Sequence, residues 1–173
     1  MAILKVARMG HPVLREKSRA VDRRDIKGPV VQRLVDDLLE TMTEYHGVAL
    51  AAPQVHEGLR IFVAALDAGD EDRPSDPVAI INPELTSVGS ELVEDWEGCL
   101  SIPDIRGMVP RARDVLVRAF DRHAERIELH AHDYAARIVQ HEADHLDGIL
   151  FLDRMRSLES LTFLDEYARY RKG

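Results

Sequence analysis

Apolar residues recur at helical spacing in two clear places along the chain. Over residues 30–42, valine, leucine and methionine lie three and four positions apart, and polar or charged residues fill the other face. This spacing predicts an amphipathic helix of roughly four turns, with Gly47 just past its end. A second helix is predicted over residues 134–146, with Asp133 as its N-cap. Gly148 lies beyond the end of that second helix.

Several other segments have the apolar or alternating pattern of β-strands. They are residues 59–65, 78–82, 91–94, 114–120 and 126–132. Residues 48–55 are apolar and contain Pro53, which predicts extended chain because proline disfavours helix in the residue before it. A last helix is predicted over residues 158–171, and a surface loop over the acidic residues 67–77. Antiparallel strands with three separated helices are typical of an α+β domain.

The composition is that of an ordinary folded chain. Its 173 residues are 45% apolar and 31% charged, which predicts a single domain over residues 1–173 and excludes a disordered tail, a collagen-like repeat and a membrane span. A net charge of −8 argues against an extended phosphate-binding face, so we expect no direct DNA binding. Cys99 is the lone cysteine and the N-terminus has no signal-peptide pattern, which favours the cytoplasm.

The strongest chemical signal is the string His141-Glu142-Ala143-Asp144-His145. Helix positions i and i+4 lie one above the other, about 6 Å apart along the axis, so two imidazoles placed there can bind one metal ion. Glu142 is the next residue round the helix and can reach a metal-bound water as a general base. The alternative is two surface histidines on an acidic helix.

A catalytic zinc-type centre also needs a third protein ligand and an open position. In the extended metalloprotease motif that ligand is a histidine, but Phe151 occupies the position here. Glu159 and Glu166 are downstream candidates. Cys99 is the remaining one, because a thiolate binds borderline divalent ions strongly, although a lone cysteine is often only a small buried apolar side chain. A metal-dependent hydrolase with Cys99 as third ligand, a metallopeptidase with a downstream glutamate as third ligand, and a binding module with a structural metal are therefore the three hypotheses.

Three segments together resemble the motifs of the peptide deformylase family. They are Gly47-Val48-Ala49-Leu50-Ala51-Ala52-Pro53-Gln54, then Glu97-Gly98-Cys99-Leu100-Ser101, then Gln140-His141-Glu142-Ala143-Asp144-His145-Leu146-Asp147-Gly148. Their order and spacing also match, and the resemblance covers nearly the whole chain. It implies antiparallel β-sheets packed around a central metal-binding helix, with an N-terminal and a C-terminal helix.

The resemblance implies a role for each motif residue. Cys99, His141 and His145 are then the metal ligands, and Glu142 is the general base. The remaining site residues are expected on the substrate side: the side-chain amide of Gln54 and the backbone N–H of Leu100 facing the oxyanion, and Gly47, Val48 and Tyr134 lining the substrate pocket. For Tyr134, a core aromatic is the alternative interpretation.

The implied activity is hydrolysis of the N-formyl group from the N-terminal methionine of newly made polypeptides. It requires one divalent metal ion per chain, with Fe(II) the expected ion in the cell and Zn, Ni or Co able to substitute. N-formylmethionyl nascent peptides are the expected partners, and the ribosome near its exit tunnel is a further candidate partner.

A few positions need separate predictions. Ala49 stands where the family usually has a second glycine in its first motif, and we expect its methyl group to point away from the cleft. Arg106 and Arg111 are expected to form surface or structural ion pairs, with orientation of substrate or of Glu97 as the alternative. His130 and His132 are placed on opposite faces of their strand and are not expected to be ligands.

Overall fold

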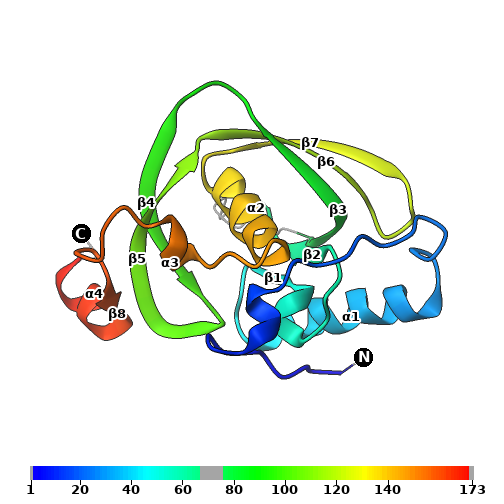
Figure 1. Cartoon of the computed structure of the whole chain (residues 1–173), viewed down its shortest axis with the longest axis horizontal. Coiled ribbons are helices and arrows are strands. Elements are labelled where there is room, and N and C mark those ends of the chain that lie inside the picture. The colour runs from blue at the N-terminus through cyan, green and yellow to red at the C-terminus, as the bar shows by residue number, and fades with distance from the viewer. Residues whose placement is uncertain (1, 67–75, 172–173) are drawn as a thin grey trace.

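Two antiparallel sheets enclose one helix in the computed structural model, which describes residues 2–66 and 76–171 (Figure 1). In the described residues, the first sheet has the order β1 (Ala49–Ala51), β2 (Ile61–Ala64), β3 (Val78–Ser87), β6 (Asp114–Phe120) and β7 (Arg126–His132). The second has the order β4 (Leu92–Cys99), β5 (Ile102–Ala112) and β8 (Thr162–Phe163). The helices are η1 (Pro12–Arg15), α1 (Pro29–Glu44), η2 (Ala52–Val55), α2 (Asp133–Leu146), α3 (Phe151–Arg154) and α4 (Leu164–Tyr170). The predicted α+β fold is confirmed.

The first sheet separates two parts of the core. Successive strand residues point to opposite faces, so Ile61 and Val63 pack in the cluster that contains the apolar side of α1. Phe62 and Ala64 pack on the other face, with the apolar residues of α2. The periodicity over residues 30–42 therefore corresponds to a real helix, and that helix covers the sheet face away from α2.

Helix α2 lies in the middle of the molecule, between the two sheets (Figure 1). It is buried around most of its circumference, so that even Arg137, Glu142 and His145 have exposed fractions of 5% or less. Gly148, two residues past the last residue of the helix, has a φ of +72°, a conformation that glycine adopts at no steric cost. A Cβ there would lie 2.6 Å from the carbonyl oxygen of Arg15, so both the backbone angle and the space require glycine.

The turn between β4 and β5 places Cys99 beside α2. Cys99 pairs with Ile102, which leaves only Leu100 and Ser101 in the connection. The pairing register shifts between Gly98 and Cys99, and such an irregularity re-aims the side chain that follows it. The thiol is therefore presented at the tip of a hairpin rather than along a regular strand.

Some predicted elements differ from those observed. Residues 52–55 form the 3-10 helix η2 instead of extended chain, because Pro53 lies in the first turn, where its missing N–H costs nothing. Strand β5 is absent from the predictions. The last helix is shorter than predicted, since residues 162–163 pair with the edge of β5. The N-cap of α2 is His132, and the Asp133 carboxylate instead accepts a hydrogen bond from Arg113.

Two further observations bear on the predictions from composition. No helix in the described part of the chain is long and apolar enough to span a membrane. Most of the acidic loop predicted over residues 67–77, namely residues 67–75, lies outside the described residues.

Candidate metal centre

Cys99, His141 and His145 meet at one point between β4 and α2. Each offers one ligand atom, and these atoms all lie within 4.8 Å of one another. The Sγ atom of Cys99 is 3.2 Å from Nε2 of His145, and the two imidazole rings are 5.0 Å apart between centroids. The structure thus brings together the three residues predicted as ligands, from two segments more than forty residues apart in the chain.

The electrostatics of this cluster favour a thiolate. Burial raises the pKa of Cys99, but the neighbouring imidazoles of His145 and His141 outweigh burial and hold that pKa well below its ordinary value. A thiolate with two imidazoles is a donor set that suits a borderline divalent ion such as Zn²⁺ or Fe²⁺. Nε2 of His145 faces the sulfur, and its buried Nδ1 has no hydrogen-bond partner among the described residues. The residues present therefore fit a bound metal ion.

Glu142 lies beside the three candidate ligands with a free carboxylate oxygen. Its side chain is buried, and its Oε2 atom has no hydrogen-bond partner in the described part of the protein. Burial raises the pKa of Glu142 above its ordinary value, and the two imidazoles oppose that rise. A buried carboxylate with an unused oxygen is the group that a proton-transfer role requires.

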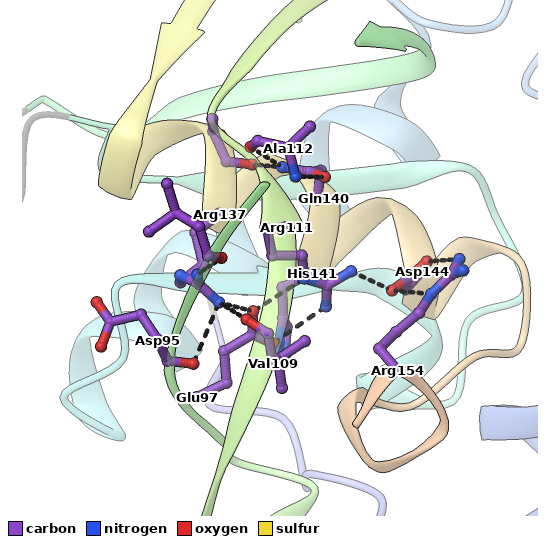
Figure 2. A network of polar contacts seen from close by, with 12 residues as sticks. Asp95, Glu97, Val109, Arg111, Ala112, Arg137, Gln140, His141, Asp144 and Arg154 are labelled. Atoms are coloured by element: carbon purple, nitrogen blue, oxygen red, sulfur yellow. Dashed lines mark hydrogen bonds and ion pairs between the residues drawn. The ribbon is translucent and has the colours of Figure 1, made fainter. Parts of the chain in front are cut away.

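Glu97 orients the imidazole ring of His141 by contacting its Nδ1 atom (Figure 2). Its carboxylate lies 2.9 Å from Nδ1 of His141, accepts two hydrogen bonds from Arg111 at 2.9 and 3.0 Å, and accepts one from Arg137 at 2.8 Å. Burial raises the pKa of Glu97, but His141 and Arg111 lower it more, to about 2. A charged carboxylate on Nδ1 leaves Nε2 of His141 for the metal side.

The same network fastens α2 to the second sheet (Figure 2). Arg111 also donates to Asp144, which accepts a further hydrogen bond of 2.7 Å from Arg154. The side chain of Gln140 bonds both backbone groups of Ala112, at 3.0 and 2.8 Å. The two expectations for Arg111 are therefore met by one contact. Its ion pair with Glu97 is structural, and the same ion pair orients the Glu97 carboxylate.

The roles of Arg137, Gln140 and Asp144 are not predicted from the sequence. Their signal is spacing along α2: Arg137 and His141 are four positions apart, as are Gln140 and Asp144. Residues four apart on a helix share one face.

A cavity of about 980 Å³ opens over the cluster. Its lining includes the residues predicted on the substrate side, namely Gly47, Val48, Gln54, Leu100 and Tyr134. Gln54 is held in one orientation, because Oε1 accepts from the backbone N–H of Ala51 at 2.9 Å while Nε2 lies 3.5 Å from Cys99 Sγ and 3.2 Å from Ser101 Oγ. Its amide N–H groups therefore point toward the metal side.

Two lining residues are placed more precisely by the structure. A Cβ at Gly47 would lie 3.2 Å from the side chain of Leu100, so glycine lets these two segments approach closely. Tyr134 is 44% exposed, which places it at the rim of the cavity rather than in the core. Ala49 lines the cavity and also packs with the core residues beneath α2.

The other candidate ligands lie elsewhere. Glu159 is exposed and Glu166 pairs with Arg169 at 3.3 Å, and within the described residues neither belongs to the metal-binding cluster. Phe151 is buried and stacks on His141 with 6.3 Å between ring centroids. The placement of His130 and His132 on opposite faces is wrong: their rings are 4.2 Å apart, because strand residues two positions apart share a face.

Comparison with known proteins assigns the family. The family model described as polypeptide deformylase matches residues 3–161. The chain belongs to the polypeptide deformylase family. Peptide deformylase 2 of Nostoc sp. is 39% identical to it, over 95% of this chain and 93% of that protein.

Solved deformylases share the fold. A ligand-bound class I type b peptide deformylase from Acinetobacter baumannii superposes with a TM-score of 0.84 at 37% identity, covering 90% of this chain and all of that one. The structure of the same deformylase with Met-Ala-Ser bound gives a TM-score of 0.82 at 38% identity, over 89% of this chain and 99% of that one. The chain is accordingly a metal-dependent hydrolase that removes the N-formyl group from new polypeptides. This assignment favours the deformylase hypothesis over the metallopeptidase and structural-metal alternatives.

Proposed function

We propose that Cys99, His141 and His145 hold the one divalent metal ion of this deformylase and that Glu142 is its general base. The observation that carries this proposal is the convergence of three ligand atoms within 4.8 Å beside a buried carboxylate oxygen without a partner. When bound, the ion supplies Lewis acidity toward the formyl oxygen and toward a water molecule.

Glu142 transfers the proton of the attacking water to the departing amine. Its unpartnered Oε2 accepts a proton from the water that attacks the formyl carbon, and the carboxylic acid then returns the proton to the departing amine nitrogen. Because the side chain is buried, bulk water does not compete for that oxygen. One group thus serves first as base and then as acid.

Gln54 and Leu100 stabilise the oxygen that gains negative charge. The Gln54 amide is fixed by its bond to Ala51, so its N–H groups are oriented before the substrate arrives. The backbone N–H of Leu100 is the second donor, from the turn that also carries Cys99. One such preorganised donor is commonly worth about 3 kcal/mol of transition-state stabilisation.

The substrates are N-formylmethionyl peptides, with the methionine side chain against Gly47, Val48 and Tyr134 at the cavity wall. The Acinetobacter baumannii deformylase with Met-Ala-Ser bound supports a methionine-led peptide. A formyl carbon carries only hydrogen, so the space beside it can be too small for larger acyl groups.

We further infer Fe(II) as the ion in the cell, with Zn, Ni or Co able to replace it, since thiolate and imidazole ligands suit all four.

A reduced thiol ligand supports a cytoplasmic location. Formylated N-termini emerge at the ribosome, which supports the exit tunnel as the place of encounter. Residues 1–173 act as one domain, since both sheets pack on α2.

Metal analysis combined with a deformylation assay tests this assignment. Cys99→Ala should lose most of its metal at limiting metal concentration, together with activity on formyl-Met-Ala-Ser, because two imidazoles alone hold a divalent ion weakly. Glu159→Gln and Glu166→Gln should keep both. Metal retained in Cys99→Ala but lost in either glutamate variant would contradict the proposed ligand set.

A further inference from the structure

The outer face of the first sheet carries a second cluster of metal-ligating side chains. Asp114 on β6 and His130 and His132 on β7 each offer a ligand atom, and these atoms lie within 4.8 Å of one another. Within the described residues this is the one such group besides the centre at Cys99. We propose that it is a second binding site, for a borderline divalent ion such as Zn²⁺.

The sheet register produces this cluster. Asp114 pairs directly with His132, and the neighbouring pair on the same face is Leu116 with His130. The alternating residues of β7, Leu129 and Ala131, pack into the core, so both histidines project outward. Three ligands from two hydrogen-bonded strands are thus held in place by the backbone, without any loop to order.

Two ligand atoms already face each other. Nδ1 of His132 forms a close hydrogen bond with Oδ1 of Asp114. An ion bound at Nδ1 replaces that hydrogen bond, and the ring proton then resides on Nε2, so the ring stays neutral. The rings of His130 and His132 are tilted by 48° to each other rather than stacked in parallel.

The donor set selects the class of ion. Two imidazoles and one carboxylate suit Zn²⁺, Co²⁺, Ni²⁺ or Cu²⁺, whereas Mg²⁺ and Ca²⁺ prefer oxygen ligands. Both histidines are exposed and Asp114 is partly exposed, so water completes the coordination and exchange is easy. This site is therefore weaker than the buried centre and fills after it.

The position of the cluster gives the ion a structural role. His132 is the residue that precedes α2, and the next residue, Asp133, has a φ of +48°, a conformation that non-glycine residues seldom adopt. An ion joining His132 to Asp114 ties this strained junction to the start of β6. Helix α2 begins there and carries Glu142 about two and a half turns later.

Equilibrium dialysis of the zinc-loaded enzyme against Zn²⁺ tests the proposal. The wild type should bind one zinc beyond the ion of the buried centre. His130→Gln and His132→Gln should each weaken binding of the further zinc ion at least about tenfold. The reason is that losing a metal ligand lowers the affinity more than losing an outer group that hydrogen-bonds to a ligand. His123→Gln, an exposed histidine in the turn of the same hairpin, is the matched control and should bind as the wild type does. Mg²⁺ should not compete.

Two results of the dialysis would overturn the proposal. One is a wild type that binds no further zinc; the other is unchanged further binding in both His130→Gln and His132→Gln. Chemical modification of the wild type by diethyl pyrocarbonate gives a readout that needs no variant to fold. Zinc should protect His130 and His132 but not His123, and equal modification with and without zinc would equally refute the site.

Discussion

Glu97→Gln should damage stability and metal binding together. Glu97 is 5% exposed, and its two oxygens accept hydrogen bonds from Arg111 and Arg137 while facing Nδ1 of His141. The substitution removes the negative charge and replaces one acceptor with an NH2 donor that faces other donors. The two guanidinium groups then remain buried without their common counter-ion.

The expected size follows from these contacts. Removing one partner of a buried ion pair typically costs about 3–5 kcal/mol of unfolding free energy. For a chain of this length, that loss corresponds to a drop in Tm of about 6–20 °C. Losing the group that hydrogen-bonds to the second ring nitrogen of a metal-bound histidine typically weakens metal binding about 10- to 100-fold.

Thermal unfolding and metal titration of the purified variant measure both effects. Glu94→Gln is the matched control, because Glu94 lies on the same strand with an exposed side chain and a 3.5 Å contact to Arg156. We expect the control to stay within about 0.5 kcal/mol of the wild type. If Glu97→Gln instead matched the control in stability and metal affinity, the reasoning about the network would be refuted.

Three further predictions concern the cavity and the ion. Gln54→Ala should lower kcat/KM about 10²- to 10³-fold with metal content unchanged, and a smaller loss than tenfold would count against its role at the oxyanion. Ala49→Gly should lower the unfolding free energy by about 1–2 kcal/mol, from one lost buried methyl and added backbone freedom, with kcat/KM within about twofold; a large fall in kcat at normal metal content would show that Ala49 holds Gln54 in place. The iron-loaded enzyme should lose activity in air faster than the nickel or cobalt forms, because Fe(II) and the Cys99 thiolate both oxidise; identical decay for all three would argue against iron at this site.

The sequence predicts the elements whose pattern is periodic. Helices α1 and α2 and strands β6 and β7 appear within a few residues of their predicted bounds. Strand β5 is not predicted because Pro103, Gly107 and Pro110 interrupt it and its apolar residues do not alternate. Pairing along the whole of β4 supplies its stability, and that pairing is not visible in the local sequence.

Some residues of the candidate site are likewise predictable from the sequence, and others are not. The proposed ligands and Glu142 are predictable because the chemistry assigned to them requires those residue types in those motifs. Arg137 and Asp144 are polar residues on a helix and would ordinarily face water, yet α2 is enclosed by both sheets and buries them. The wrong placement of His130 and His132 has a simpler cause, since a period of two puts both on one face.

The most direct test of the central claim is turnover by metal-loaded Glu142→Gln. Glutamine keeps the shape of the side chain and leaves Cys99, His141 and His145 in place, but it cannot accept the proton from water. We expect one ion per chain and a loss of about 10²- to 10⁴-fold in kcat on formyl-Met-Ala-Ser, with Glu128→Gln on the outer sheet face unaffected. Wild-type turnover by a fully metal-loaded Glu142→Gln would contradict the account.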